Sequence, residues 1–316
     1  MAESAPPVPR LGFVGLGNIG GGICANLVAD GHEVSVYDLD PARVDALAQA
    51  GAHPARSVAE VADAAAWTFV SVPSPADMEA VAAEWLDAAV VAAGPAVLAD
   101  KILVDLTTNA PAVVRAVGSR IEAAGAALVE APVTGGAVGA RNRQLVFIVG
   151  GDERVVSQVE PLLGTLGRAV FRMGPLGSGN VGKLVNSLLA FTTMWVSLEG
   201  MALAAKSGVD LRTLVEMVRT SGGAASYLDR RVEEIATRGR PAAFSLDLAA
   251  KDAGLMLDAG RDTGVPLPVA SALHQMLSFA RAQGLGGRDI SDLVEVAERA
   301  AQVELVLRPP EAPPEG

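Results

Sequence analysis

Cysteine, histidine and aromatic residues are scarce in this chain of 316 residues. Cys24 is the single cysteine, which excludes an intrachain disulfide and is typical of a protein kept in a reducing compartment. The three histidines, His32, His53 and His274, lie far apart and lack the spacing of a metal site. We therefore expect no disulfide, no metal ion and a cytoplasmic location.

Basic residues are also few. The chain has 25 Lys and Arg against 36 Asp and Glu, which gives a formal net charge of -11. Nucleic acids and anionic membranes bind proteins through concentrated basic surfaces, so this balance argues against both partners. An anionic substrate would have to be held by a few local groups.

The first residues, MAESAPPVPR, carry an acid and three prolines where a secretory signal would carry basic residues followed by an apolar run. The most membrane-like stretch, Leu188 to Ala205, contains Glu199 and several small polar residues. We predict that this stretch is a core helix packed on all sides rather than a membrane span.

The first half of the chain alternates short β-branched runs with alanine-rich segments. This alternation is typical of repeated βα units around a doubly wound parallel sheet, and several of the runs are apolar enough to be covered on both faces. The predicted strands are Leu11–Val14, Glu33–Tyr37, Trp67–Val72, Ile102–Asp105, Ala126–Val129, Leu145–Val149 and Arg168–Arg172.

Beyond Met173 the sequence shows helical periods and almost no strand signal. We therefore predict an α/β domain over residues 1–175, with a flexible tail at 1–9, and an all-α domain over 176–305, with a flexible tail at 306–316. The predicted helices of the second domain are Ser178–Ser207, Leu211–Thr220, Tyr227–Thr237, Leu246–Thr263, Pro268–Gln283 and Ser291–Leu305.

A glycine motif, Gly15-Leu16-Gly17-Asn18-Ile19-Gly20, follows the first predicted strand and opens a predicted helix. In that context Gly15 forms the tight turn, Gly17 admits the pyrophosphate and Gly20 lets helix and strand pack closely. Asn18 and Ile19 begin the helix, whose N-terminal amides favour phosphate binding. The motif predicts a Rossmann dinucleotide-binding domain.

Asp38 ends the second predicted strand, eighteen residues beyond Gly20. A carboxylate there can accept hydrogen bonds from the ribose hydroxyls and would repel a 2′-phosphate. No cation follows it immediately, and Arg43 lies on the next helix. We therefore expect NAD, with NADP less favoured.

Three further motifs identify a family: EAPVTGG from Glu130, GSGNVGKLVN from Gly177 and FSLDLAAKD from Phe244. With GFVGLGNIG, and in this order and spacing, they closely resemble the β-hydroxyacid dehydrogenases, which include 3-hydroxyisobutyrate dehydrogenase and tartronate semialdehyde reductase. The resemblance extends from Leu11 to about Gln302. It implies hydride transfer between nicotinamide and the hydroxyl carbon of a small 3-hydroxy acid, or reduction of its semialdehyde, with NAD.

The resemblance also implies roles for individual residues. Lys183 would be the catalytic general acid and base, and the substrate carboxylate would be bound by Thr134, Gly135 and Gly136. The residues implied to line the cofactor are Val72, Pro73, Thr108 and Lys251.

These roles are chemically reasonable. Alcohol oxidation needs a group that takes the hydroxyl proton as the hydride leaves, and a lysine can do so if burial and the positive nicotinamide lower its pKa. A Thr-Gly-Gly turn can hold a carboxylate through backbone amides and one hydroxyl, without a dedicated arginine.

Two departures from the family pattern concern the site. The usual DAPVSGG is EAPVTGG here, which keeps the acid and the hydroxyl and alters the room beside the substrate. The usual K-x-x-N-N is Lys183-Leu184-Val185-Asn186-Ser187, so the second asparagine is missing. Asn186 and Ser187 lie three and four residues beyond Lys183, so either could contact the substrate oxygen.

Two other functions remain open: an imine reductase-like enzyme, and an NAD-binding scaffold that has lost catalysis. The imine reductases usually lack the lysine found here as Lys183. A branch acting on phosphorylated sugars fits less well, since it needs a cationic phosphate pocket and a larger helical domain. We also expect a homodimer or homotetramer, because the apolar helix near Leu188 is too long for its own few neighbours to bury.

Overall fold

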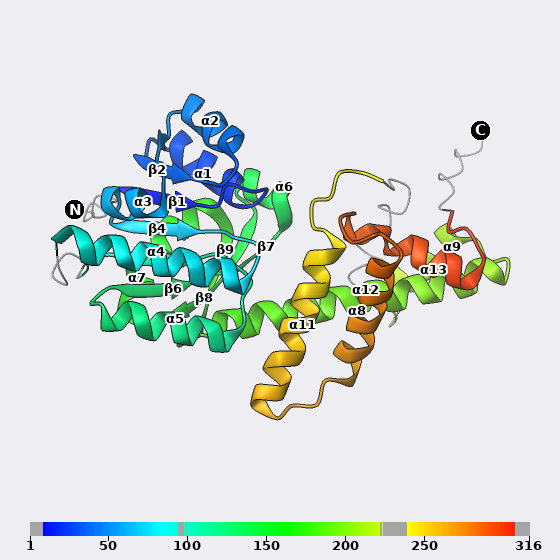
Figure 1. The fold of residues 1–316 in the computed structure, drawn as a ribbon. Coiled ribbons are helices and arrows are strands. Elements are labelled where there is room, and N and C mark those ends of the chain that lie inside the picture. Colours follow the sequence, from blue (N-terminus) through cyan, green and yellow to red (C-terminus); the bar gives the residue numbers. More distant parts are fainter. Residues whose placement is uncertain (1–8, 94–97, 99, 222, 224–238, 307–316) are drawn as a thin grey trace, which may run out of the picture. The chain divides into compact units, whose positions relative to one another are not determined.

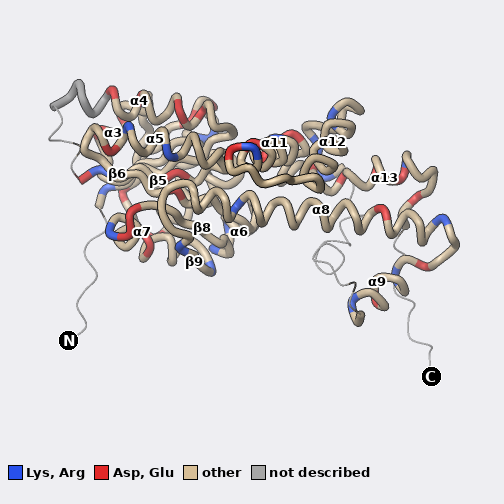
Figure 2. Tube along the Cα trace, turned by 90° about the horizontal axis from the view of Figure 1, so that it is seen from below, with Lys and Arg blue, Asp and Glu red and all other residues tan. Residues whose placement is uncertain are grey.

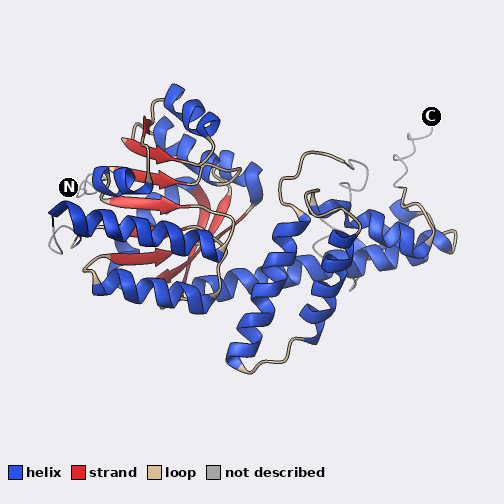
Figure 3. Ribbon diagram, in the orientation of Figure 1, coloured by secondary structure: helices blue, strands red, loops and turns tan. Residues whose placement is uncertain are grey.

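A computed structural model describes residues 9–93, 98, 100–221, 223 and 239–306. The chain divides into two compact units, Met1–Leu184 and Val185–Gly316. All strands of the described residues lie in the first unit, and the second unit is helical (Figure 3). The predicted helix Tyr227–Thr237 lies outside the described residues.

The first unit is built on one mixed sheet. Its strands are ordered β3-β2-β1-β4-β5-β6-β8-β7, with β9 paired to the other side of β8. The strands are β1 (Leu11–Val14), β2 (Val34–Tyr37), β3 (His53–Pro54), β4 (Trp67–Val70), β5 (Ile102–Asp105), β6 (Ala127–Glu130), β7 (Val133–Thr134), β8 (Leu145–Gly151) and β9 (Gly167–Gly174).

Helices cover both faces of this sheet (Figure 1). One apolar cluster joins the sheet to α1 (Gly20–Ala29), α2 (Pro41–Gln49), α6 (Gly136–Arg141) and α7 (Glu153–Leu166). The other joins it to α3 (Val58–Ala64), α4 (Pro75–Ala93) and α5 (Pro111–Ala123). This arrangement confirms the predicted doubly wound α/β architecture.

The predicted strands are all present, with ends that differ by at most two residues. The parallel order holds from β1 to β6, but β8 runs antiparallel to β6 and β7. The predicted parallel sheet is thus confirmed from β3 to β6, and the direction of β8 was not predictable because an apolar run such as LVFIV has the same pattern in either direction. The two-residue strands β3 and β7 are too short to give a pattern.

The second unit contains the greater part of α8 (Ser178–Lys206), which crosses the boundary between the units. It also contains α9 (Leu211–Arg219), α11 (Leu246–Thr263), α12 (Pro268–Ala282), the 3-10 turn η3 (Ile290–Asp292) and α13 (Leu293–Ala301). Ser245 caps α11 by accepting from the N–H of Leu248, and Gly264 ends it with φ +70°. The single helix predicted from Ser291 begins instead as η3 and ends at Ala301.

The expectation that α8 is packed on all sides is wrong. Five large apolar side chains on this helix are exposed: Val181, Val185, Leu189, Val196 and Leu203. Figure 2 shows α8 with very few charged positions along its length. Among the described helices it is the one long and apolar enough to cross a membrane by length and composition, and 33% of its most apolar window is buried. Core helices of globular proteins pass the same test.

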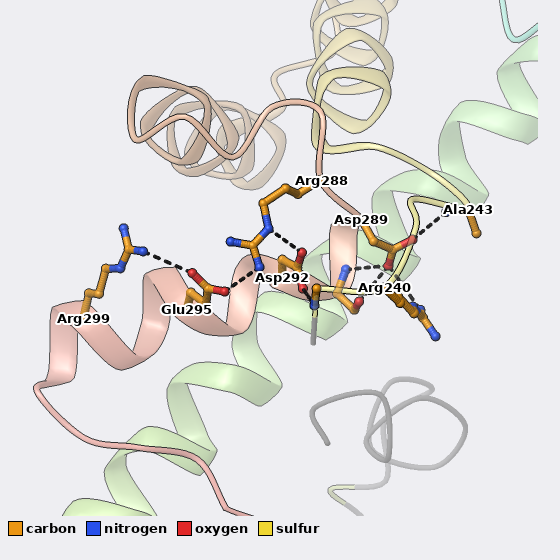
Figure 4. Close-up of polar contacts among 9 residues, drawn as sticks. Arg240, Ala243, Arg288, Asp289, Asp292, Glu295 and Arg299 are labelled. Carbon is orange, nitrogen blue, oxygen red and sulfur yellow. Dashed lines mark hydrogen bonds and ion pairs between the residues drawn. The ribbon is translucent and has the colours of Figure 1, made fainter. Parts of the chain in front are cut away.

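A polar network holds the segment before α11 to the start of α13 (Figure 4). Asp289 is buried and accepts hydrogen bonds from the N–H of Ala243, the guanidinium of Arg240 and both donors of Ser291. Burial alone would raise the pKa of Asp289, but these donors together lower it to about 2. The network therefore fixes the approach to α11, the helix that carries Lys251.

Candidate functional site

The order of successive strands across the sheet reverses at β1, which pairs with β2 on one side and with β4 on the other. In open α/β sheets the crevice at such a switch point, outside the carboxyl ends of the strands, is where nucleotides bind. Gly15 follows β1 there, and its N–H donates to the carbonyl of Tyr37 at the end of β2. Val72 lies two residues beyond the end of β4. The predicted cofactor residues of the first unit thus gather at one edge.

The glycine loop has the geometry that its sequence predicts. Gly15 adopts φ +88°, and a Cβ at this residue would lie 2.2 Å from the carbonyl oxygen of Ser71. A Cβ at Gly20 would lie 2.0 Å from the carbonyl oxygen of Gly15, so α1 starts directly on β1. At Gly17 the nearest atom would be Nη1 of Arg43, 3.7 Å away. The loop is therefore tight on the sheet side and open above Gly17, as a cradle for a pyrophosphate must be.

Asp38 is turned toward this loop. Its Oδ2 accepts from the N–H of Leu16 at 2.6 Å, and its Oδ1 accepts from the N–H of Asp40 at 2.8 Å. Arg43 Nη1 lies 3.6 Å from Oδ2, and Arg43 Nε lies 3.3 Å from a carboxylate oxygen of Asp40. The cation that the sequence placed only on the next helix therefore lies beside the carboxylate predicted to bind ribose.

The DLTTN segment at the end of β5 is hydrogen-bonded to the segment that follows β4, beside the predicted cofactor residue Val72. The N–H of Val72 donates to Oγ1 of Thr107 at 3.2 Å, and the N–H of Thr107 donates to Oδ1 of Asp105 at 2.9 Å. Asn109 Nδ2 lies 3.5 Å from Oδ2 of Asp105. Burial raises the pKa of Asp105 to about 7, against the effect of these donors. Thr108, the predicted cofactor residue, is half-buried beside them.

The predicted substrate turn follows β7. Thr134 is half-buried and is paired with Val146 of β8, while Gly135 and Gly136 adopt φ +126° and +65°. Nothing lies within 4 Å of a Cβ placed at Gly136, so the backbone there is uncovered. Both glycines are required by their positive φ, and the open side of the turn leaves room for an anion.

This turn leads into α6, which packs beside the nucleotide helix α1. Asn26 Nδ2 donates to the carbonyl of Ala140 at 2.8 Å, and a Cβ at Gly22 would lie 3.0 Å from Cβ of Ala140. The structure therefore brings the helix that follows the predicted substrate turn against the helix that follows the glycine loop.

Glu130 does not border the substrate turn in the way we expected. Its side chain is fully buried, and its carboxylate accepts hydrogen bonds from Gly177, Gly179 and Asn180 at the start of α8. Burial raises the pKa of Glu130 above its usual range, although these donors oppose the rise. The glutamate in EAPVTGG therefore binds the start of α8 and does not shape the space beside the predicted substrate turn.

Lys183 lies near the start of α8, at the end of the first unit, and is half-buried. A Cβ at the preceding Gly182 would lie 3.1 Å from Cγ2 of Ile148 on β8, the strand that also pairs with β7. Asn186 and Ser187 follow on the same helix within the second unit. Asn186 is exposed and Ser187 is buried.

Lys251 lies on α11 in the second unit and forms an ion pair with Asp252, with Nζ 3.1 Å from Oδ1. Asp252 is buried, whereas the side chain of Lys251 is 22% exposed. The ion pair holds the ammonium group close to its own helix. The predicted residues are divided between the two units.

Several polar residues at this edge have no role in the sequence prediction: Thr107, Asn109 and Asn180. A partial signal existed, because DLTTN and GSGN place polar side chains directly after an apolar strand and at a helix start. The pairing between these two distant segments required the structure. No group of three or more His, Cys, Asp or Glu side chains among the described residues could hold a metal ion.

Two family models match the chain. Residues 10–174 match the NAD-binding domain of 6-phosphogluconate dehydrogenase, and residues 177–297 match the NAD-binding domain of NADP-dependent 3-hydroxyisobutyrate dehydrogenase. Together they cover both predicted domains.

Individual relatives agree with these matches. The 2-(hydroxymethyl)glutarate dehydrogenase of Eubacterium barkeri is 31% identical over 302 residues, which cover 94% of this chain and 97% of the relative. The NAD-dependent L-serine dehydrogenase of Pseudomonas aeruginosa is 31% identical over 293 residues, which cover 89% and 95%.

Solved structures show the same likeness. The 3-hydroxyisobutyrate dehydrogenase of Mycobacterium tuberculosis, described with L-serine, has a TM-score of 0.82 and 26% identity, covering 92% of this chain and 99% of that one. Solved imine reductases are 18% to 20% identical to this chain, and at that identity the likeness shows the fold alone.

Proposed function

The chain belongs to the β-hydroxyacid dehydrogenase family, and from that premise we propose that it oxidises the hydroxyl carbon of a small 3-hydroxy acid, or reduces the corresponding semialdehyde. The observation that carries this proposal is the placement of Lys183 on a helix whose start packs on β8, the strand that pairs with β7, which ends at Thr134. NAD, when bound, supplies the acceptor or donor of the hydride. The glycine loop and Asp38 fit it, since the loop is open above Gly17.

The protein's own residues handle the proton and the substrate's charge. Lys183 takes the hydroxyl proton during oxidation and returns it to the carbonyl oxygen during reduction. The uncovered backbone at Gly136 and the hydroxyl of Thr134 hold the carboxylate. Val72, Pro73 and Thr108 of the first unit line the cofactor, and the family resemblance assigns Lys251 to the cofactor as well.

Of the two candidates that follow Lys183, we propose Asn186 for the hydrogen bond to the substrate oxygen. Asn186 is exposed on α8, whereas Ser187 is buried within the chain. A side chain must be accessible to contact a substrate that enters from solvent. Ser187 then supports the helix rather than the reaction.

The decisive test is a screen of small 3-hydroxy acids and their semialdehydes, with turnover followed by NADH absorbance. We expect NAD-dependent oxidation of at least one 3-hydroxy acid and no decarboxylation. Tight NAD binding without turnover on any member would support the scaffold alternative instead. Turnover of cyclic imines but not of hydroxy acids would support the imine reductase alternative, which the retained Lys183 disfavours.

We also propose that α8 is covered by a second copy of the chain. The exposed residues Val181, Val185, Leu189, Val196 and Leu203 recur at intervals of four or seven residues, which places them along one stripe of the helix. Exposed apolar stripes of this length mark interaction surfaces, and a homodimer or homotetramer would bury them.

Sedimentation velocity tests this assembly. We expect a dimer or tetramer at micromolar concentration, and we expect Leu189→Glu to dissociate it. Val265→Glu is the matched control, because Val265 is exposed but lies outside α8. A wild-type chain that sediments as a monomer at every concentration would contradict the proposal.

We also propose a cytoplasmic location. The sequence has a single cysteine, Cys24, and can form no intrachain disulfide, which is typical of proteins in a reducing compartment. Cell fractionation tests the location, and recovery of the chain in a membrane or secreted fraction would contradict it.

A further inference from the structure

Glu130 is the last residue of β6, at the carboxyl edge of the sheet, and its side chain is 0% exposed. Its neighbours in the strand register are Asp105 of β5 and Gly150 of β8. A carboxylate buried at such a position destabilises the fold unless hydrogen-bond donors replace the water that it has lost. The identity of those donors therefore indicates what the residue does.

All four hydrogen bonds to this carboxylate come from the start of α8. Oε1 accepts from the N–H of Gly177 at 2.5 Å and of Gly179 at 2.9 Å. Oε2 accepts from the N–H of Asn180 at 3.0 Å and from its Nδ2 at 2.7 Å. These N–H groups lie at the N-terminus of α8, where a helix leaves donors unpaired and where a negative charge is favourable.

Glycines make this close contact possible. A Cβ at Gly150 would lie 2.3 Å from Oε1 of Glu130, and a Cβ at Gly179 would lie 2.5 Å from the carbonyl oxygen of Ile148. The first turn of α8 is therefore in direct contact with β8, with no side chain between them. A shift of the helix along or away from the sheet would break contacts on both sides.

Asn180 links the carboxylate to the cofactor side of the same edge. Its Oδ1 accepts from the N–H of Asn109 at 2.7 Å while its Nδ2 donates to Glu130. Asn109 in turn approaches Asp105, whose other oxygen accepts from Thr107. A continuous chain of hydrogen bonds thus joins the end of β5 to the start of α8.

Lys183 lies three residues beyond Asn180, one turn further on the same side of the helix. We propose that Glu130 is a positioning residue for the reaction: by fixing the first turn of α8 to the sheet, it sets where the ammonium group of Lys183 lies relative to the strand ends. This inference rests on the proposed function, because the role of Lys183 belongs to it.

An ordinary helix cap would not have this effect. Asp152 caps α7 from the residue just before the helix, by accepting from the N–H groups of Arg154 and Val155. Such a cap satisfies donors but ties the helix only to its own preceding loop. Glu130 reaches α8 from 47 to 50 residues upstream, so it fixes the helix to a strand of the sheet.

The test compares Glu130→Gln with wild type under conditions in which both are folded. The amide keeps the volume but presents N–H groups to the donors of α8, so the first turn must shift. We expect kcat to fall about tenfold to a hundredfold, the usual cost of a displacement near 1 Å, while the Kd for NAD changes by less than about threefold. Hydrogen exchange at the amides of Gly179 and Asn180 should become faster.

Asn180→Ala provides a second variant that removes one donor and leaves the carboxylate in place. If both residues act through the same anchor, the double variant should have a kcat within about threefold of the worse single variant. Asp152→Ala is the matched control. It loses the hydrogen bonds that cap α7 in the same unit without touching α8, so it should lower Tm but leave kcat unchanged.

Two outcomes overturn the proposal: a kcat within about twofold of wild type in both Glu130→Gln and Asn180→Ala, or a loss of kcat in Asp152→Ala as large as in Glu130→Gln at equal Tm. If Glu130→Gln does not fold, Asn180→Ala and its hydrogen exchange decide. Failure of the proposed function is separate, since Lys183→Ala would then keep normal kcat while exchange at Gly179 still reported the anchor.

Discussion

The carboxylate of Asp38 accepts a hydrogen bond from the N–H of Leu16, with Oδ2 2.6 Å from the nitrogen. The end of β2 is thereby fixed to the middle of the glycine loop. Arg43 lies 3.6 Å from the same oxygen and over Gly17. The carboxylate predicted to bind the ribose thus lies beside Arg43, a cation that could otherwise attract a 2′-phosphate.

We therefore predict a preference for NAD that Asp38 controls. Asp38→Ala should lower kcat/KM with NAD by about tenfold and raise it with NADP, because Arg43 loses its ion-pair partner and becomes available to a phosphate. Steady-state kinetics with both cofactors measure the ratio. Asp40→Asn is the control, since it removes the charge of the outer partner of Arg43 and keeps the acceptor that caps α2. An unchanged ratio in Asp38→Ala would show that the carboxylate does not face the ribose.

Lys183→Ala should stop turnover but leave NAD binding largely intact, because the cradle of Gly15 to Gly20 and Asp38 is unaffected. We expect kcat to fall by about a hundredfold or more, the usual contribution of general acid-base catalysis. Calorimetric titration of NAD and single-turnover kinetics separate the two quantities. Asn186→Ala should also lower kcat, whereas Ser187→Ala should mainly lower Tm. Near-normal kcat in Lys183→Ala would refute the mechanism.

The substrate should need a free carboxylate. Because Gly136 is uncovered and Thr134 is half-buried beside it, a methyl ester should bind poorly, with kcat/KM reduced by about tenfold or more. Thr134→Val should lower kcat/KM for the acid more than for the ester, since it removes one hydrogen-bond donor to the carboxylate. An ester as efficient as its acid would require another role for Thr134, Gly135 and Gly136.

The sequence predicts local structure well where the backbone geometry permits only one type of residue. Gly15 and Gly20 were assignable because a turn of positive φ and a helix lying on a strand leave no room for Cβ. The buried chain from Asp105 through Asn109 and Asn180 to Glu130 was not predictable. Its members come from separate segments, and hydrogen bonds between them leave no period in the sequence.

Burial was the other source of error. The apolar character of α8 indicated a core helix, yet hydrophobicity does not distinguish a side chain covered by its own chain from one covered by a partner. The sequence motif indicates only that Glu130 replaces the usual aspartate of the family near the substrate turn. Its direction toward α8 depends on the strand register, which the sequence does not specify.

The last prediction concerns Asp105, whose pKa burial raises from 3.8 to about 7, with the charge of Glu130 adding to the rise against donors from Thr107 and Asn109. Between these two values the folded protein holds a proton that the unfolded chain has released. Stability of the first unit should therefore fall as pH rises through this window, and the full cost should persist above pH 7. Asp105→Asn holds no titrating proton, so its loss of stability with pH should be smaller.

Denaturant unfolding near pH 5 and pH 8 measures this difference, with Trp195→Phe in every variant so that fluorescence reports Trp67 and Trp85 of the first unit. Relative to wild type, Asp105→Asn should gain about tenfold or more in the folding equilibrium constant between the two pH values. Asp30→Asn is the control for sign in the same unit, because the hydrogen bond from Arg143 lowers the pKa of Asp30 and its stabilisation is lost only as pH falls. Equal pH slopes in Asp105→Asn and wild type would show that Asp105 is ionised throughout, and that its donors outweigh its burial.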